Sequence, residues 1–592
     1  MKPIAIRRRN GATAAHAWPV DMHPLLARVF AARGLAPVDV ARTRLADLVA
    51  PSTLGGIGRA CALLAAAIAA DERICVVGDF DCDGATGTAV AVRGLRLLGA
   101  RNIGYRVPNR FRDGYGLSTS LVDTLAGAEV PWLILTVDNG IASHAGVAAA
   151  CARDIRVVVT DHHLPGETLP GADAIVNPNV AGDEFPSKAL AGVGVMFYLL
   201  LALRAHLRAT GLFAARGAAE PDLSVLLDLV ALGTVADLVP LDANNRILVD
   251  AGLRRIRAGR CCAGVAALYG AAGRDMTRAV ASDLGFALGP RINAAGRLDD
   301  MGLGIECLLS DEPVQAAALA GQLSSINAQR RELQSAMVEQ AEVMVATFLD
   351  RYRGDAPPHG VVLHEADWHP GVVGLVASKL KERLHRPVVA FAALENGPSL
   401  PDARAQDTHA GTELRGSARS IAGFHLRDAL AEIDVTCPGL ITRFGGHAMA
   451  AGLTICAADL TRFAAEFDAV AHRRLDAEML EQFLWSDGEL AADDFNLDTA
   501  QALRYAVPWG QGFAEPAFDN AFEVESWRAV GERHLKLTLR LVGRAEPLEA
   551  IMFNALEAMP PPSRLRAVYQ LDVDQWNGRD RLQLVVRHIE AI

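Results

Sequence analysis

Residues 76–87, "VVGDFDCDGATG", place three aspartates at alternate positions, Asp79, Asp81 and Asp83, between an apolar run and a glycine-containing segment. The apolar run "RICVVGDF" predicts a buried strand, and "GATGTAVAVRGLRLLGA" after it predicts a helix. Three like charges at the end of a buried strand repel one another and lose hydration, at a cost on the order of several kcal/mol. We therefore expect a cation at this point of the fold.

The alternation of strand and helix continues on both sides of this motif from about residue 58. The strands "NIGYRVPN", "PWLILTVD" and "IRVVVTD" are separated by single helices, and most are apolar on both faces. This pattern predicts an α/β fold with a parallel sheet covered by helices. In such sheets, ligands bind beyond the carboxyl ends of the strands. Two of these ends carry polar motifs, "TVDNG" with Asp138 and "VTDHH" with Asp161, His162 and His163.

The length of 592 residues is too great for one hydrophobic core and predicts several domains. A long apolar periodicity predicts a connector helix, and the alternation in "HLKLTLRLVG" and "RAVYQLDVDQWNGRDRLQLVVRHIE" predicts a small β-barrel with a hairpin turn at Asn577-Gly578. The expected parts are an N-terminal segment (1–50), a first α/β domain (51–310), a connector helix (311–350), a second α/β domain (351–460) and a barrel with a helical lead-in (461–592).

Composition limits the classes of protein. With 51% hydrophobic and 21% charged residues, the chain is typical of a soluble globular protein. The arginine run near the N-terminus is not followed by an apolar stretch, and no window is expected to span a bilayer, so we predict a cytoplasmic protein without membrane contact. Nine cysteines without a CxxC pair, including Cys61, Cys75 and Cys151 in apolar runs, predict buried reduced thiols. The net charge of −11 still allows local arginine clusters to bind phosphate.

Two familiar interpretations of the opening motif fail. An EF-hand calcium loop requires a glutamate at its twelfth position, where this chain has Val90, and a helix rather than a strand before it. A phosphatase with an aspartyl nucleophile requires D-x-D-x-T, and neither Asp83 nor Ala85 is the required threonine.

A fourth acidic motif changes the interpretation of the first three. "GTVADLVPL" places Asp237 at the end of an apolar, helix-like run. One buried histidine is usually a core residue, but four acidic motifs that the fold brings together are difficult to explain as a solvated surface. Carboxylates with one or two imidazoles suit Mn²⁺ or a similar ion better than Ca²⁺, and they also allow Mg²⁺. Because the potential ligands exceed what one ion usually takes, two ions about 3.5 to 4 Å apart are expected.

These four motifs, in order, resemble those of the DHH phosphoesterase superfamily. The further stretches "ALGPRINAAGRLDD", "WHPGVVGLVASKL", "RGSARSI", "FGGHAMAAG" and "PWGQGFAEPAFDN" resemble the bacterial members that degrade single-stranded DNA from 5′ to 3′. The similarity runs from about residue 20 to the end of the chain. It implies a DHH catalytic domain, a DHHA1 companion and an OB-fold, used in DNA repair and recombination.

The resemblance also implies roles for the acidic and imidazole residues. Asp138 would bridge the two cations, His163 would contact the scissile phosphate, and Asp161 would orient its neighbours. Water activated by the cations would attack phosphorus and release 5′ mononucleotides. The residues at the family's metal positions are Asp79, Asp81, Asp83, Asp138, His162 and Asp237.

Other residues are candidates for DNA or phosphate contacts. The segments "RGSARS" and "FGGH" combine guanidinium groups with glycines that let backbone N–H groups approach an anion. Arg110 and Arg291 match family positions that hold DNA or its 5′ phosphate, whereas Arg112 and Arg297 could equally form surface ion pairs. The candidates are Arg110, Arg291, Asn293, His369, Ser378, Arg415, Ser417, Arg419, Gly445, Gly446 and His447. Trp509, Trp527 and Trp576 could stack on bases, but we expect two of the three in the core.

Two other functions compete with a nuclease. A hydrolase of small phosphates, such as pyrophosphate, a cyclic dinucleotide or nano-RNA, would need neither the connector helix nor the barrel. A non-catalytic DNA-binding relative would have lost ligands, and the motifs here are complete. The resemblance implies a monomer that acts on single-stranded DNA and cooperates with single-strand-binding protein and a RecQ-type helicase.

Overall fold

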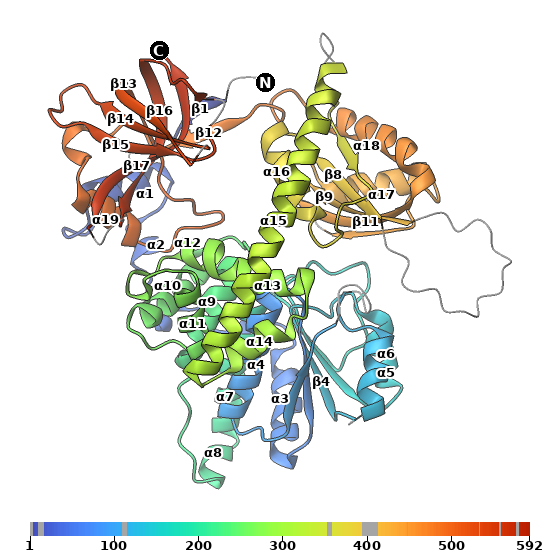
Figure 1. The fold of residues 1–592 in the computed structure, drawn as a ribbon. Helices are drawn as coiled ribbons and strands as arrows, with labels where there is room; N and C mark the ends of the chain where they lie inside the picture. The colour runs from blue at the N-terminus through green and yellow to red at the C-terminus, as the bar shows by residue number, and fades with distance from the viewer. Residues whose placement is uncertain are drawn as a thin grey trace. The chain divides into compact units, whose positions relative to one another are not determined.

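The computed structural model describes residues 4–9, 17–108, 115–128, 130–351, 358–393, 413–446, 448–531, 533–555, 558–575 and 579–592. The chain forms two compact units, drawn together in Figure 1. One unit contains Met1–Ala5 and Ser325–Phe483, and the other contains Ile6–Ser324 and Leu484–Ile592. Each unit is described by itself, beginning with the larger one.

The larger unit contains the predicted parallel sheet. Its strand order is β3-β2-β4-β5-β6, and every neighbouring pair is parallel. The carboxyl ends of the strands therefore lie at one edge, as the sequence predicted. The strands are β2 (Ile74–Val77), β3 (Ile103–Arg106), β4 (Leu133–Val137), β5 (Arg156–Thr160) and β6 (Ala174–Val176).

Helices cover both faces of this sheet because successive side chains of a strand point to opposite faces, and here both faces are apolar. Ile74 and Val76 belong to the large hydrophobic core, whereas Cys75 and Val77 belong to a smaller cluster on the opposite face. The smaller cluster includes α5 (Thr119–Ala128) and α6 (His144–Cys151), seen in cyan in Figure 1. The large core includes α3 (Ile57–Ala70), α4 (Cys82–Leu97) and α7 (Gly192–Ala209).

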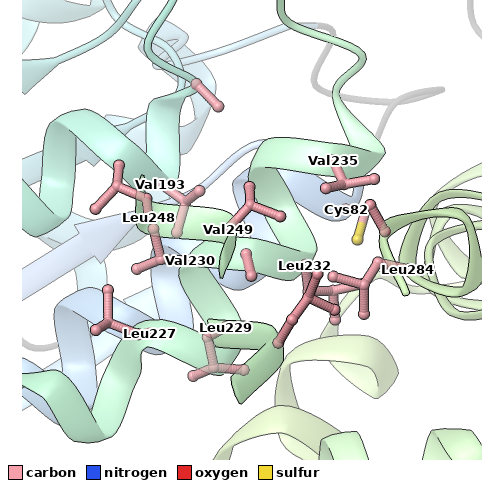
Figure 2. Packing of buried hydrophobic residues seen from close by; sticks show 14 of the residues in the cluster. Cys82, Val193, Leu227, Leu229, Val230, Leu232, Val235, Leu248, Val249 and Leu284 are labelled. Carbon is pink, nitrogen blue, oxygen red and sulfur yellow. The ribbon is translucent and has the colours of Figure 1, made fainter. Parts of the chain in front are cut away.

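Helix α9 (Leu227–Ala236) is mostly apolar, and its residues from Leu227 to Val235 are all buried, including the polar Asp228 and Thr234. It packs against α4, α7, α10 (Ala243–Arg257) and a π-helical turn, η5 (Leu284–Leu288). Figure 2 shows Val230 and Leu232 of α9 among Val193, Val249 and Leu284. The packing of this run therefore fixes the position of Asp237, the half-buried residue that caps α9.

The sequence predicted that no window is long and apolar enough to span a bilayer. This prediction was wrong, because some helices meet those criteria of length and composition. Helix α7 is 18 residues long with a mean hydropathy of 1.3, and the bent pair Leu45–Thr53 and Ile57–Ala70 meets the same criterion. Most of α7 (61%) is buried inside the protein. It is apolar on several faces because it packs against the sheet, α3, α4 and α9 at once. Helix α7 is thus a core helix of the catalytic domain.

The cysteines in the described residues are free thiols, and Cys61 and Cys75 are buried as predicted. The expectation was wrong for Cys151, which is exposed. The last turn of α6 directs Val147 and Ala150 toward the sheet, so the next residue lies on the outer side of the helix.

Shorter elements complete the catalytic part of this unit. Before the sheet come α1 (Pro24–Ala32), α2 (Pro37–Ala41), η1 (Leu45–Asp47) and η2 (Pro51–Thr53). After β6 and α7 come α8 (Leu212–Ala215), η3 (Leu223–Leu226), α11 (Ala263–Ala271), η4 (Met276–Arg278), α12 (Ala281–Asp283), α13 (Gly289–Leu298) and α14 (Gly302–Leu309).

The C-terminal part is the five-stranded barrel that the sequence predicted. It closes in the order β13-β14-β15-β17-β16. The strands are β13 (Phe518–Val530), β14 (His534–Arg540), β15 (Leu548–Met552), β16 (Arg564–Asp574) and β17 (Arg581–Ala591), preceded by β12 (Phe483–Ser486), η7 (Ala492–Asp494) and α19 (Leu497–Tyr505). Strand β12 pairs with the N-terminal strand β1 (Ala5–Arg8).

The barrel tryptophans differ in exposure. Trp509 is buried and stacks on Phe513, and Phe30 of α1 packs beside both rings. Trp527 is 45% exposed on β13. Trp576, together with the predicted turn at Asn577-Gly578, lies outside the described residues.

The smaller unit contains a second α/β domain, and its main segment begins inside the long helix α15 (Pro313–Arg351), where the sequence predicted a connector helix. Its sheet has the order β10-β11-β9-β8-β7, with only β7 and β8 parallel. The strands are β7 (Val361–His364), β8 (Val388–Ala393), β9 (Glu413–Arg419), β10 (Arg443–Gly446) and β11 (Ala450–Cys456).

Helices α16 (Val373–Leu384), α17 (Leu426–Thr436) and α18 (Leu460–Arg474) accompany this sheet, with η6 (Ala457–Asp459) before the last. Phe463 and Phe467 of α18 are buried in the same hydrophobic cluster as Phe391 and Phe424. The core of the second domain therefore continues past residue 460, where we placed its boundary.

Candidate metal centre

The acidic and imidazole motifs converge at the carboxyl edge of the parallel sheet. Three overlapping groups each have ligand atoms within 4.8 Å of one another. The groups are Asp79 with Asp81 and Asp138, Asp138 with His162 and His163, and Asp83 with His162 and Asp237. Four distant segments of the chain therefore meet at one centre.

His162 and Asp138 occupy the middle of this centre. Nε2 of His162 lies 3.0 Å from Oδ1 of Asp138, 3.5 Å from Oδ2 of Asp237 and 3.9 Å from Oδ2 of Asp83. Asp79, Asp83 and Asp138 are each less than 5% exposed. Asp138 belongs to two of the three groups, which is the position that a bridging carboxylate requires.

The first motif is held by helix ends. Asp81 is the N-cap of α4, and its Oδ1 accepts a hydrogen bond from the Gly84 N–H at 3.0 Å. The Asp83 carboxylate accepts from the N–H groups of Gly192 at 2.6 Å and Val193 at 2.9 Å. These two N–H groups begin α7, so the positive end of that helix compensates for the burial of Asp83.

The backbone at Asp138 is strained. Its φ is +62°, in the left-handed region that non-glycine residues rarely adopt. The side-chain amide of Asn139 donates to the carbonyls of Val77 at 3.0 Å and Val137 at 2.9 Å, which fixes the ends of β2 and β4 beside it. A Cβ at Gly192 would lie 2.5 Å from Cβ of Asp138. The turn is therefore imposed by its surroundings, as is typical of functional sites.

Asp161 holds the two histidines rather than joining the cluster of ligands. Its Oδ1 accepts from the N–H groups of His162 at 2.8 Å and His163 at 3.0 Å, and it lies 2.7 Å from Nδ1 of His163. Its Oδ2 accepts from the Ile141 N–H at 2.9 Å. Although burial opposes both shifts, this bond lowers the pKa of Asp161 and raises the pKa of His163 to about 9.

The electrostatics of the centre require positive charge from outside the protein. Within the described part of the chain, no arginine or lysine forms an ion pair with Asp83, Asp138 or Asp237. Burial, followed by the neighbouring carboxylates, raises the pKa of Asp138 and of Asp237 well above the usual range. The same causes raise the pKa of Asp83 to about 7. The repulsion predicted from the sequence is thus present in the fold.

The donor set suits a divalent cation. Oδ1 of Asp138 is buried and has no hydrogen-bond partner among the described residues. Carboxylate oxygens with one imidazole nitrogen are the donors that Mn²⁺ prefers, and Mg²⁺ accepts the oxygens. The residues in position to hold such ions are Asp79, Asp81, Asp83, Asp138, His162 and Asp237.

Several residues of the centre were not identified from the sequence. They are Gly192 and Val193, which bind Asp83, Asn139, which ties two strands, and Tyr115, whose hydroxyl donates to the Asp138 carbonyl at 3.1 Å. The sequence signals were the glycines of "DGYG" and "GVGV", since a helix start with small residues allows close approach. Nothing in the sequence, however, placed these segments beside Asp138.

The predicted DNA contacts of this unit stay predictions. Arg110 and Arg112 lie outside the described residues. The Arg291 guanidinium donates to Oγ of Ser324 at 2.8 Å and to the Ala287 carbonyl at 2.5 Å. Oδ1 of Asn293 accepts from the Cys82 N–H at 2.8 Å, which helps to hold the start of α4. Arg297 lies in the last turn of α13.

In the smaller unit, β9 brings together the candidates of "RGSARS". Arg415, Ser417 and Arg419 are half-buried on one face of β9, and the residues between them are buried on the other. Nη1 of Arg419 donates to Oγ of Ser417 at 3.0 Å. Gly452 of β11 pairs with Ser417 on one side and with Gly445 of β10 on the other.

The start of α16 lies over the same face. A Cβ at Gly374 would lie 2.8 Å from Oγ of Ser417 and 2.9 Å from Nη2 of Arg419. Nδ1 of His369 accepts from the Gly371 N–H at 3.1 Å, and Ser378 is half-buried on α16. Gly446 ends β10, and His447 lies outside the described residues. Guanidinium groups and a helix N-terminus therefore meet on one surface, which is suited to an anion.

Comparisons with known protein families match three parts of the chain. Residues 73–234 match the DHH family, N-terminal domain, residues 358–473 match the DHHA1 domain, and residues 486–588 match the RecJ OB domain. These are the three kinds of domain that the resemblance implied.

Close relatives cover the whole chain. The chain is 51% identical to the single-stranded-DNA-specific exonuclease RecJ of Dickeya dadantii, over 99% of both proteins. It is 47% identical to the RecJ of Escherichia coli, over 100% of this chain and 99% of that protein. Among solved structures, RecJ of Thermus thermophilus in complex with Mn²⁺ is similar with a TM-score of 0.79 and 30% identity, over 100% of this chain and 80% of that one. Its complex with Mg²⁺ has a TM-score of 0.73.

Proposed function

Because the chain belongs to the RecJ family of single-stranded-DNA-specific exonucleases, we propose how its own residues carry out that reaction. The protein is an exonuclease that acts on single-stranded DNA with a divalent cation, Mn²⁺ or Mg²⁺. Hydrolysis proceeds from the 5′ end and releases 5′ mononucleotides. The observation that carries the proposal is the convergence of four motifs on Asp138 and His162.

The carboxylates of the centre and His162 would hold the cations, and Asp138 would be the carboxylate shared between them. When bound, the cations neutralise the phosphodiester and lower the pKa of the attacking water. Because Nδ1 of His163 is bound to Asp161, Nε2 is the atom that His163 presents to a phosphoryl oxygen. A charged imidazole at that position stabilises the negative charge that develops at phosphorus.

The described residues support direct attack by water rather than a covalent intermediate. Cys82, the thiol nearest the motif, is 1% exposed, and burial raises its pKa well above the usual value. The hydroxyl of Thr86 donates to the Cys82 carbonyl at 2.8 Å inside α4. Neither group is an activated nucleophile.

The anion-binding face of β9 holds the 5′ phosphate of the DNA strand. Arg415 and Arg419 supply guanidinium groups, and the backbone near Gly374, Gly445 and Gly446 allows close approach. Arg110, Arg291 and Asn293 contribute contacts in the other unit. In the cell, the protein acts in the cytoplasm as a monomer in DNA repair and recombination, with single-strand-binding protein and a RecQ-type helicase as partners.

The test of the reaction is a nuclease assay with 5′-labelled single strands in Mn²⁺ or Mg²⁺. We expect labelled mononucleotides from single strands, little release from a blunt duplex, and no release in EDTA. Asp138→Ala should abolish turnover and leave DNA binding intact, whereas Asp275→Ala, a change at an exposed aspartate bound to Thr277, should have no effect. Substantial cleavage by Asp138→Ala, or cleavage of pyrophosphate or a cyclic dinucleotide in preference to DNA, would contradict the proposal.

The phosphate contact is tested separately by Arg415→Ala. We expect weaker binding to all sequences alike and a shallower dependence of binding on salt, since a phosphate contact releases counterions and reads no base. Fluorescence anisotropy at several salt concentrations measures both quantities. A variant that changed base preference would contradict the assignment.

A further inference from the structure

Tyr115 is not among the residues identified from the sequence, and its hydroxyl reaches the metal centre. It precedes Gly116, which has a φ of +72°, and a short loop that leads to α5. The residue is 48% exposed, yet its hydroxyl is within hydrogen-bond distance of two of the motifs. One edge of the ring therefore faces solvent, while the hydroxyl faces the cluster.

The hydroxyl joins the Asp138 turn to His163. Its O–H donates to the backbone carbonyl of Asp138 at 3.1 Å, and its oxygen lies 3.3 Å from Nδ1 of His163. Nδ1 of His163 is also 2.7 Å from Oδ1 of Asp161, so the proton on Nδ1 points to that carboxylate. A protonated Nδ1 cannot accept the tyrosine proton, so the Tyr115 O–H donates to the Asp138 carbonyl while its oxygen lies beside Nδ1–H of His163.

The Tyr115 ring also contacts the first acidic motif. It packs edge-to-face against Phe80, the residue between Asp79 and Asp81 in the sequence, with ring centroids 5.9 Å apart and an interplanar angle of 79°. It meets His163 in the same way at 5.9 Å and 82°. Tyr115 thus touches all three strand-end motifs of the sheet while supplying no metal ligand itself.

Asp138 is the residue that most needs such support. Its positive φ costs on the order of 1 to 3 kcal/mol, and it persists only if neighbouring groups fix both sides of the turn. On one side the Asp138 N–H donates to the Thr160 carbonyl at 3.0 Å. On the other side, the Asp138 carbonyl receives the Tyr115 hydroxyl.

The loop that carries Tyr115 is itself anchored. The Leu117 N–H donates to Oγ of Ser143 at 3.1 Å, and a Cβ at Gly116 would lie 2.9 Å from that same oxygen. Leu117 is buried in the cluster under α5 and α6. The hydroxyl is therefore held in place from outside the metal centre.

We propose that the Tyr115 hydroxyl is a positioning group that sets the Asp138 turn and the orientation of the His163 ring for catalysis. This inference rests on the proposed function for the roles of Asp138 and His163. It does not rest on any contact between Tyr115 and DNA. Loss of the hydroxyl should weaken cation binding through Asp138 and slow the chemical step through His163.

The test compares Tyr115→Phe with wild type and with Tyr105→Phe as a matched control. The Tyr105 hydroxyl bonds Glu306, and neither residue belongs to the metal centre, so its loss removes one tyrosine hydroxyl without removing a contact of the centre. For Tyr115→Phe we expect kcat and Mn²⁺ affinity each to fall on the order of tenfold, with KM for DNA changed less than about twofold. Calorimetric titration with Mn²⁺ and steady-state kinetics give the three quantities, and the control should match wild type.

Each other outcome has a definite meaning. Wild-type kcat and Mn²⁺ affinity in Tyr115→Phe would overturn the proposal, as would a raised KM with unchanged kcat, which would make the hydroxyl a substrate contact. If Tyr115→Phe has a lower melting temperature than the control, Tyr115→Leu separates ring from hydroxyl: the proposal requires Tyr115→Leu and Tyr115→Phe to lose Mn²⁺ affinity equally. If wild type binds Mn²⁺ but does not degrade DNA, the proposed function fails, while the Mn²⁺ comparison still decides the role of Tyr115.

Discussion

Two groups of carboxylates in the same unit differ in how their negative charge is neutralised. At the metal centre, Asp83, Asp138 and Asp237 have no arginine or lysine ion-pair partner in the described chain. At the barrel, Asp519 accepts from Arg8 at 2.6 Å and from the Ser486 hydroxyl at 2.5 Å. Asp487, beside it, pairs with Arg33 at 2.8 Å and Arg9 at 3.1 Å.

The difference separates structural charge from functional charge. The N-terminal strand and α1 bring arginines to the barrel carboxylates, so that pair is neutralised within the protein and needs nothing from solution. The sheet-edge carboxylates are neutralised by helix N–H groups in part, and otherwise depend on a ligand. The barrel carboxylates are therefore paired with arginines of the protein, whereas the sheet-edge carboxylates are suited to bind cations from solution.

The largest expected effect comes from a substitution in the arginine-paired group, Asp519 and Asp487. Asp519→Ala leaves the Arg8 guanidinium and the Ser486 hydroxyl without their shared acceptor and should lower the free energy of unfolding by roughly 3 kcal/mol. The loss should be the same in Mn²⁺ and in EDTA. Asp138→Ala in EDTA should cost much less, or stabilise, since it removes a like charge from a repulsive cluster. Urea unfolding measures both, and a large loss for Asp138→Ala in EDTA would erase the distinction.

The next effect concerns the cation itself. Mn²⁺ at about 100 times its dissociation constant should stabilise wild type by about 2.7 kcal/mol, since it binds the folded chain and not the unfolded one. Asp519→Asn should keep this gain, and Asp138→Asn should lose most of it. Thermal unfolding with and without Mn²⁺ reports the difference. Equal gains in the two variants would show that the ion binds elsewhere.

The smallest expected effect concerns Glu515, a carboxylate whose neighbours include both arginines and another carboxylate. Burial, followed by Asp572, raises the pKa of Glu515 to about 6, although Arg504 and Arg587 oppose the shift. A carboxyl whose pKa is raised on folding stabilises the fold below its unfolded pKa and loses that contribution as pH rises to about 6. Relative to wild type, Glu515→Gln should therefore gain at most about 2 kcal/mol of stability between pH 4 and pH 7. Parallel pH profiles for the two proteins would contradict this.

Much of the fold and of the metal centre could be predicted because the relevant signals are local. Alternating strands and helices indicated a parallel sheet, and parallel strands bring their carboxyl ends together whatever the details of packing. Asp138 and His162 therefore needed only their position after an apolar strand. The closed barrel likewise followed from alternation over its strands.

The parts that sequence reasoning missed depend on contacts between distant segments. The bond from the Gly192 N–H to Asp83 spans 109 positions, and that from the Cys82 N–H to Asn293 spans 211. No periodicity encodes such pairs. The exposure of Cys151 and the burial of α7 have the same origin, since each depends on which neighbours pack against a helix rather than on its composition.

The anchoring of Asp83 on the first N–H groups of α7 has a consequence during synthesis. A nascent chain that has emerged only as far as His163, just beyond β5, carries three of the four acidic motifs, but Asp83 still lacks the helix that holds it, and Asp237 has not been made. Nuclease competence therefore arrives late, with the packing of the most apolar helices of the domain. A chain released before α7 and α9 have packed lacks the contacts that complete the metal centre.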